Sequence, residues 1–463
     1  MYDFLLAGSA LLFAFVAFGY ARHPAASFFH PATIYLAFHG LVFVIRPIFA
    51  RIFDYSALYR AAAFFPSDGD KVTVILAANL GMLTFLATSL AIARYPVATG
   101  PAEIDEAERA RLVKPFLLVF LLVLPIGLAS LFQNWAVVAD GWSAMQIDMA
   151  TGVQHNETMN GWFFTALLAL VPCVVAFAWF FRFRWWSLLP FVVYFVLLAG
   201  TGGRGPFVVA AVAIVILYLF QRGRQWPDWR GMVIALIVIV AFTQIVVDRG
   251  QGVRALFTQE VGETPGYQAP PGPLASMDYA NMEFFEYIVW AVPKQTGTYD
   301  YFLSNLQIFT EPIPRVWWTS KPLGAPIKRF NLFDYGEPFG FTYSVPGAGW
   351  LAWGWIGVVI QSAIFAAAFS WLHRRLALKS RSNIYLLFYA VTIASTIIAF
   401  RDGIILSAIR TLPFYGGPVL LLWLFHRALE RRPQPWDRAP AHAHGPQPRL
   451  TPAERRRLLA ATL

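Results

Sequence analysis

Charged residues are scarce in this chain of 463 residues: Asp, Glu, Lys and Arg together make up only 13% of it. Soluble domains carry about 25% charged residues, so a water-soluble globular enzyme is excluded. Hydrophobic residues reach 58%, and they come in continuous runs of about twenty, long enough to cross a bilayer as helices. Continuous runs favour helices over the alternating pattern of a membrane β-barrel. The composition therefore predicts an all-α polytopic membrane protein.

Cysteine is nearly absent, and histidine is rare. The single Cys173 lies inside an apolar run, which excludes a disulfide framework and a cysteine metal site. None of the 8 histidines falls between residues 249 and 345, and the acidic residues there form no pattern typical of a zinc or other divalent-cation site. We therefore expect a site that uses no metal and no cofactor.

About eleven apolar runs are long enough for transmembrane helices. The N-terminus lacks basic residues, and Arg22 and His23 follow the first run. This order predicts an uncleaved helix that enters from outside rather than a signal peptide. The expected helices span residues 3–20, 32–50, 72–93, 115–133, 161–181, 186–200, 206–220, 231–248, 346–372, 383–400 and 404–425.

The net charge is +10, from 36 Lys and Arg against 26 Asp and Glu. On a soluble protein this would suggest a nucleic-acid partner. Here the basic residues cluster in short loops, as the positive-inside rule requires of the cytoplasmic side. We therefore expect no nucleic-acid partner and a multi-pass protein of the bacterial inner membrane with its N-terminus in the periplasm. The clusters that fall on one side are Arg94, Arg109, Arg111 and Lys114; Arg182 and Arg184; Arg222, Arg224 and Arg230; Arg374, Arg375, Lys379 and Arg381; and the tail from residue 426.

The spans divide the chain into four parts. Residues 1–248 hold the first eight helices, residues 249–345 form a long extracytoplasmic loop, residues 346–425 hold the last three helices, and residues 426–463 form a basic cytoplasmic tail. The loop is rich in Trp, Tyr, Phe and Pro, and a short helix is expected over Ala275–Trp290. Such a composition predicts a structured loop that lies against the membrane surface.

Several cations lie outside the cytoplasmic clusters and have no topological explanation. The first is Arg204, in the turn Gly203-Arg204-Gly205-Pro206 between two apolar runs. Glycines permit a tight turn, and Pro206 suits the first position of the next helix. The free N–H groups of that helix, with Arg204, would form an anion site. The alternative is a plain turn whose arginine contacts lipid headgroups.

The second cationic feature is the stretch from Pro314 to Pro322, followed by Lys328 and Arg329. Arg315 and Lys321 are six residues apart, and Trp317 and Trp318 lie between them. Aromatic rings stack on sugar faces, while arginine and lysine bind phosphate. The alternative is that the two tryptophans are ordinary anchors at the membrane interface.

The last two features are Arg401-Asp402-Gly403, which separates two apolar runs, and Arg410 in the final run. About seven residues of helix place Arg410 on the order of 10 Å below the outer boundary. A guanidinium at that depth needs a partner or water, and it therefore marks a candidate functional site. Pro413 is expected to kink the helix just beyond it. The structural alternative is an Arg410–Asp402 ion pair that holds two helices together.

Two further residues lie in the second run. Arg46 is expected to snorkel to the outer surface, and His39 is expected to be a hydrogen-bonded core residue rather than a catalyst. Glu283 and Glu286 are three residues apart on the expected loop helix and are therefore neighbours. The acids expected to be available outside are Asp278, Glu283, Glu286, Asp334, Glu337 and Asp402.

Together these motifs resemble those of bacterial oligosaccharide repeat-unit polymerases, the Wzy-type O-antigen and exopolysaccharide polymerases. The similar stretch is Ile313-Pro314-Arg315 with Trp318, Lys321 and Pro322, and a glycine-rich helix start with Gly347, Gly349 and Gly354 follows about 25 residues later. The turn at 202–205 and the Arg401/Arg410 ending are also similar. The resemblance covers roughly residues 186–425. It implies the fold of metal-independent C-type glycosyltransferases.

The resemblance implies a transfer reaction outside the cytoplasmic membrane. The donor would be a glycan on undecaprenyl diphosphate, and the acceptor would be a sugar hydroxyl of a new lipid-linked repeat unit. Membrane lipid, a flippase and a chain-length-determining copolymerase would be its other partners. The diphosphate would be stabilised by Arg315, Arg401 and Arg410, with support from Arg204, Lys321, Arg329 and the glycines Gly203 and Gly205. Trp317, Trp318 and Tyr335 would contact sugars, and the candidates for a general base are Asp278, Glu286, Asp334 and Asp402.

Two other functions stay open. One is a ligase or related transferase that moves a lipid-linked glycan to another acceptor. Ligases of this kind usually carry a histidine in the large outer loop; its absence here favours a polymerase, and His155 lies in a different loop. The other is a lipid-linked oligosaccharide or polysaccharide transporter, for which pseudo-symmetric halves and broken helices at the bilayer midplane would be expected.

Overall fold

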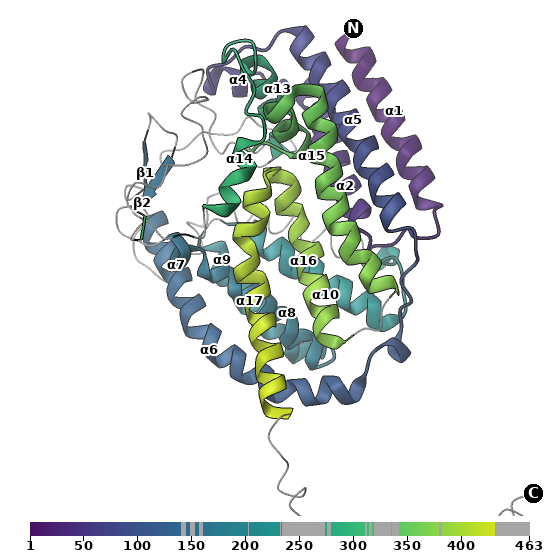
Figure 1. Ribbon diagram of the computed structural model, residues 1–463, viewed down its shortest axis with the longest axis vertical. Coiled ribbons are helices and arrows are strands. Elements are labelled where there is room, and N and C mark those ends of the chain that lie inside the picture. The colour runs from purple at the N-terminus through teal and green to yellow at the C-terminus, as the bar shows by residue number, and fades with distance from the viewer. Residues whose placement is uncertain are drawn as a thin grey trace, which may run out of the picture.

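The structure is a computed structural model (Figure 1), and it describes residues 1–139, 145–148, 153–156, 161–201, 203–231, 233, 274–275, 279–310, 313, 317–318, 335, 342–378 and 382–430. These residues form helices and one short hairpin of two strands. The elements are α1 (Tyr2–Ala21), α2 (Pro31–His39), α3 (Arg46–Ile52), α4 (Ala57–Ala61), α5 (Asp68–Ile92), α6 (Glu106–Ala139), β1 (Met145–Asp148), β2 (Val153–Asn156), α7 (Gly161–Thr165), α8 (Leu170–Phe180), α9 (Leu189–Ala199), α10 (Gly205–Arg222), α13 (Asn281–Ala291), α14 (Leu303–Leu306), α15 (Val345–Leu378), α16 (Asn383–Asp402) and α17 (Ile405–Glu430).

Within the described residues, nine helices are long and apolar enough to cross a membrane. This confirms a helical multi-pass protein. A tenth apolar segment, Trp185–Ala199, is shorter, and residues 234–248 lie outside the described residues. The count of eleven therefore stays a prediction. The nine candidate spans are Tyr2–Ala21, Pro31–Ile52, Asp68–Ile92, Glu106–Val137, Trp162–Phe180, Gly205–Arg222, Val345–Leu378, Asn383–Asp402 and Ile405–Glu430.

The basic loops meet at one end of the bundle. Arg182 donates to Glu106 at 2.8 Å, and the backbone N–H of Asn383 donates to Glu108 at 2.9 Å. The side chain of Gln225 donates to the carbonyl of Val97 at 2.7 Å. These contacts join the loops before α6, after α8, after α10 and before α16, which were predicted to share one side of the membrane. We call the end of the bundle where these four loops meet the basic end.

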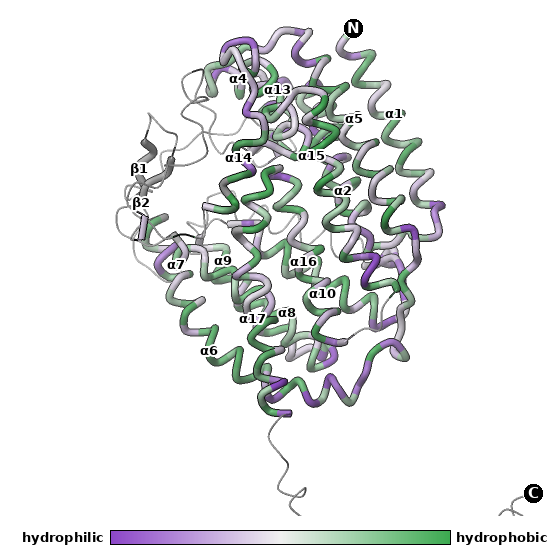
Figure 2. Tube along the Cα trace, viewed as in Figure 1, coloured by the Kyte–Doolittle hydropathy of each residue, from purple (hydrophilic) through white to green (hydrophobic). Residues whose placement is uncertain are grey.

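The opposite end contains the N-terminus, α4, α13 and the start of α15. Figure 2 shows hydrophilic residues near α4 and α13 and around the start of α6, with mostly hydrophobic helices between them. A bilayer requires a protein that crosses it to have an apolar middle between two polar ends, and this bundle has that arrangement. The arrangement also positions the candidate site, because α16 starts at the basic end and meets α17 well short of the end that contains the N-terminus and α4 (Figure 1).

Helix α15 is broken near its start, whereas the sequence predicted one continuous helix over 346–372. Trp353 and Gly354 have non-helical backbone angles, and Gly354 has φ +55°. Residues 345–352 and 355–378 therefore form two helical segments joined by a sharp turn. They cross closely, because a Cβ on Gly357 would lie 2.0 Å from the carbonyl oxygen of Gly349. Only glycine permits this approach of two backbones.

Helix α13 was predicted over Ala275–Trp290 on a loop that lies against the membrane surface. In the structure it begins at Asn281, and every residue from Asn281 to Val289 is buried. The helix packs against α5 and α15. Its phenylalanine, tyrosine and isoleucine residues surround the axis, and a helix that is apolar all round is stable only when it is enclosed. This part of the loop is therefore inserted into the bundle.

Candidate functional site

The residues Arg401, Asp402 and Gly403 form a corner between α16 and α17, which we call the Arg401 corner. Arg401 and Asp402 end α16, and Gly403 follows in the left-handed conformation with φ +71°. A Cβ on Gly403 would lie 1.9 Å from the carbonyl oxygen of Ser344. The chain therefore needs glycine at this position, both for the backbone angle and for the space.

Three buried polar groups hold this corner in place. The backbone N–H of Ser344 donates to the Arg401 carbonyl at 2.8 Å, and the amide of Asn281 donates to the same oxygen at 3.0 Å. Gln361 donates to the Gly403 carbonyl at 2.7 Å. The last carbonyls of a helix have no partner within the helix, so these bonds satisfy them and tie α16 to α13 and α15.

Arg204 lies close to the Arg401 corner. It immediately precedes α10, where Pro206 stands in the first turn and no side chain caps the helix N-terminus. A Cβ on Gly205 would lie 3.1 Å from the side chain of Ile398, one turn before Arg401. Arg204 at the start of α10 and Arg401 at the end of α16 therefore lie at the ends of two packed helices that point away from the basic end. Gly203 supports the turn by donating its N–H to Thr201 at 3.1 Å.

Arg410 lies in the second turn of α17, which continues through Pro413. The side chain of Arg410 lies outside what the structure describes, and so does the alternative ion pair with Asp402. Five further candidates also fall outside the described residues: Arg315, Lys321, Arg329, Asp278 and Asp334.

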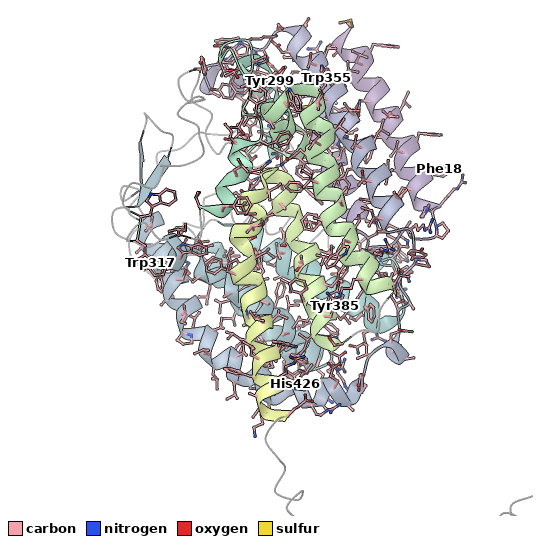
Figure 3. All side chains as sticks on the ribbon, in the orientation of Figure 1. Phe18, Tyr299, Trp317, Trp355, Tyr385 and His426 are labelled. Atoms are coloured by element: carbon pink, nitrogen blue, oxygen red, sulfur yellow. The ribbon has the colours of Figure 1, made fainter. Side chains whose placement is uncertain are left out.

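Three aromatic candidates belong to the described residues. Trp317 is 81% exposed, and Figure 3 shows it far from the labelled Tyr299 and Trp355. Trp318 is partly buried. Tyr335 donates its hydroxyl to the carbonyl of Gln295 at 3.5 Å, which connects it to the segment that follows α13. The structure does not bring Tyr335 into contact with the Arg401 corner.

Arg46 was expected to snorkel to the outer surface, and this was wrong. The side chain is fully buried, and its Nε donates to both carboxylate oxygens of Glu283 at 3.0 Å. The guanidinium also donates to the carbonyl of Leu274. Glu283 was expected among the accessible acids, but it is 3% exposed. A buried arginine requires an acid with good geometry, and α13 supplies that acid.

Glu286 is buried one turn further along α13, with 1% of its surface exposed. The hydroxyl of Tyr59 donates to it at 2.6 Å, and the Lys71 ammonium lies 4.8 Å from the centre of the Tyr59 ring. Burial, with a smaller contribution from the Glu283 carboxylate, raises the pKa of Glu286 to about 8. Glu286 was also expected among the accessible acids, so this expectation was wrong as well.

His39 was expected to be a hydrogen-bonded core residue; its place in the core is confirmed, and the hydrogen bond is not. The ring is fully buried and stacks on Phe13 with 5.9 Å between ring centres. Within the part of the chain that the structure describes, neither ring nitrogen has a hydrogen-bond partner. His155 lies in β2, opposite Gln146 of β1. Among the described residues, no group of three or more His, Cys, Asp or Glu side chains is placed to hold a metal ion.

Sequence reasoning missed the residues that support the Arg401 corner. Gln361 is a polar residue inside an apolar helix, and such residues commonly mark a specific contact within the membrane. That signal was available in the sequence. Asn281 and Ser344 carried no comparable signal, since both belong to the predicted extracytoplasmic loop, where a polar residue is ordinary.

No family model, curated protein or solved structure matches the chain.

Proposed function

We propose that this protein is a glycosyltransferase that polymerises oligosaccharide repeat units carried on undecaprenyl diphosphate. The observation that carries the proposal is the packing of the start of α10, immediately after Arg204, against α16 one turn before Arg401. Arg204 and Arg401 lie outside the basic end, so the positive-inside rule does not explain their charge. Two arginines beside an uncapped helix N-terminus suit a ligand with several negative charges, such as a diphosphate.

The proposed orientation follows from the positive-inside rule. The basic end faces the cytoplasm, so the Arg401 corner, α4 and α13 face the periplasm. Lipid-linked repeat units that a flippase has moved to the outer leaflet would present their diphosphate at this level. The product would be O-antigen or exopolysaccharide, and a copolymerase would set its length.

The proposed reaction is a displacement at the anomeric carbon of the donor glycan. The acceptor hydroxyl oxygen forms a bond to that carbon, the carbon–oxygen bond to the diphosphate breaks, and undecaprenyl diphosphate leaves with the bonding electrons. Negative charge develops on the leaving group. Preorganised cations stabilise such charge strongly where water is excluded. We assign this role to Arg204 and Arg401, together with Arg315 and Arg410, and a supporting role to Lys321 and Arg329.

The acceptor proton passes to a carboxylate in this proposal, and Asp402 is the preferred one of the two that the structure describes. Asp402 is partly exposed beside Arg401, so it can meet a substrate. Glu286 is enclosed and bonded to Tyr59, so a substrate hydroxyl does not reach it. A general base must lie within reach of the proton that it accepts.

The test is a reaction of purified protein with lipid-linked repeat units as the only substrate. We expect a ladder of longer lipid-linked glycans. Replacing Arg204, Arg315, Arg401 or Arg410 by Ala should reduce the rate by about 100-fold or more, the scale for loss of one preorganised donor. Lysine at position 401 or 410 should restore little, because it lacks the planar fork of arginine. Arg51→Ala is the control: Arg51 lies at the same end but is exposed and paired with Asp3.

Three outcomes would contradict the proposal. Transfer only to a separately supplied acceptor would indicate a ligase. Movement of the lipid-linked unit across a vesicle membrane without any new glycosidic bond would indicate a transporter. Loss of the ladder in a chelator, with recovery on addition of Mg²⁺, would overturn the assignment of charge stabilisation to arginine.

A further inference from the structure

A cluster of three aromatic residues lies at the end of the molecule opposite the basic end. It consists of Tyr299, Tyr301 and Trp353, and we call it the aromatic cluster. Tyr301 packs edge-on against Tyr299 at 6.3 Å and against Trp353 at 6.4 Å between ring centres. Tyr301 is 54% exposed and Trp353 is 44% exposed. Figure 3 shows Tyr299 at the same end as the N-terminus. The cluster is therefore open to a ligand.

The backbone fixes the rings in this arrangement. Tyr301 and Phe302 have φ values of 50° and 62°, a region that residues with side chains rarely adopt. Tyr301 and Asp300 donate their N–H groups to the carbonyls of Ala352 and Leu351 at 2.7 and 2.9 Å, which joins this turn to the break in α15. Strained backbone persists only where its surroundings hold it, and it is concentrated at binding and catalytic sites.

The aromatic cluster and the Arg401 corner lie at opposite ends of one short helical segment. Ser344, just before this segment, bonds to the Arg401 carbonyl, and Ala352, at its end, bonds to Tyr301. Eight residues at 1.5 Å each separate the two contacts by about 12 Å. A short oligosaccharide with its reducing end at the corner would therefore reach the cluster.

The surroundings of the cluster are polar as well as aromatic. Gln295 is exposed, and Thr296 and Thr298 are partly exposed in the segment that leads to Tyr299. A sugar ring has the same mixed character, because its C–H face packs on the electron-rich face of an aromatic ring while its hydroxyls need hydrogen-bonding partners. The amide nitrogen of Gln295 and the hydroxyls of Thr296 and Thr298 donate to backbone carbonyls, and the oxygens of these side chains can accept hydrogen bonds from sugar hydroxyls.

We propose that the aromatic cluster is a saccharide-binding subsite that holds the sugars of the growing glycan distal to the diphosphate. This inference rests on the proposed polymerase function and names a subsite outside the Arg401 corner. Retention of the glycan here would let the protein extend the same chain repeatedly.

The first experiment compares product lengths for Trp353→Ala and Tyr301→Ala with the wild type in the ladder assay. The rate at which two single repeat units are joined should change by less than about twofold. The ladders should become much shorter, because the distal sugars lose their contact with the aromatic cluster. Trp353→Phe, which keeps a ring, should restore long products. Trp371→Ala is the matched control, since Trp371 is similarly exposed (57%) on α15 but lies near its other end. Wild-type ladders from both alanine variants, or equal shortening by Trp371→Ala, would overturn the proposal.

The second experiment needs no turnover. The probe is the water-soluble oligosaccharide released by mild acid from the same lipid-linked repeat unit, and its binding is followed by saturation-transfer NMR. We expect transfer from aromatic protons to sugar C–H protons, with affinity weakened about tenfold in Trp353→Ala, the scale for loss of one stacked ring. Binding without any ladder would overturn the polymerase and keep the subsite. A ladder without binding would overturn only the subsite, and absence of both would overturn the two together.

Discussion

Glu283 and Glu286 are one turn apart on the same buried helix and yet have different surroundings. Glu283 accepts two bonds from the Arg46 guanidinium. Among the described residues, Glu286 has the neutral Tyr59 hydroxyl as its hydrogen-bond partner, and burial raises the pKa of Glu286 to about 8. Two acids of identical chemistry therefore have a cationic partner in one case and a neutral partner in the other.

This difference predicts opposite effects of the same substitution. The raised pKa means that folded protein keeps a proton on Glu286 between about pH 4.5 and 8, where unfolded protein has lost it. Stability therefore falls as pH rises through this window. Glu286→Gln still accepts a hydrogen bond from the Tyr59 hydroxyl. This variant should raise the melting temperature at pH 8 and make the melting temperature less dependent on pH. Glu283→Gln should lower the melting temperature, because it leaves Arg46 without an anion. Thermal unfolding in detergent between pH 5 and 8 measures both, and a lower melting temperature for Glu286→Gln at pH 8 would contradict the assignment.

At the scale of elements, α13 is fastened to the bundle by buried polar groups. Arg46 at the start of α3 binds Glu283, Tyr59 of α4 binds Glu286, and Asn281 binds the end of α16. These bonds connect a helix of the long loop to three parts of the chain that precede or follow it by many residues. The helix therefore contacts both the N-terminal helices and the Arg401 corner.

The Arg46–Glu283 pair is expected to couple α3 and α13 strongly. Arg46→Met leaves a buried carboxylate unpaired and should cost about 3–5 kcal/mol of stability. Adding Glu283→Leu should recover a large part of that loss, because the apolar pair fills the same space without a charge. The exposed pair Arg51–Asp3, with side chains 68% and 64% exposed, provides the control, and Arg51→Met should cost less than about 1 kcal/mol. A double-mutant cycle from thermal unfolding measures the coupling; equal losses for the two arginines would refute it.

At the scale of the whole molecule, both ends hold exposed and buried cations: Arg51 is exposed at the end that contains the N-terminus, and Arg109 is buried at the basic end. Arg182 and Arg224 at the basic end are exposed and paired with surface acids. Arg46 at the other end is buried, and Arg204 and Arg401 are partly buried beside helix ends. The first group suits contact with lipid headgroups and the cytoplasm, and the second suits a defined site.

The proposed orientation predicts which end a membrane-impermeant thiol reagent reaches. The native Cys173 is 2% exposed, so the wild-type chain should stay unlabelled. Asp68→Cys, at the exposed start of α5, should react in intact cells. Ala102→Cys, exposed near the basic end, should react only after the membrane is permeabilised. Labelling in the reverse order would invert the orientation and place the Arg401 corner in the cytoplasm.

The apolar runs, the basic loops and the breaks at Gly203–Gly205 and Gly403 were all predictable, because they depend on local composition and on the bilayer as solvent. On that basis the sequence alone determined a helical multi-pass protein with its basic loops at one end. The position of α13 inside the bundle, the Arg46–Glu283 contact and the support of the Arg401 corner by Asn281 and Gln361 became known from the three-dimensional packing. These contacts join residues as many as 237 positions apart. Hydrophobic periodicity describes the neighbours of a residue along one helix, and it carries no information about which distant polar group satisfies a buried charge.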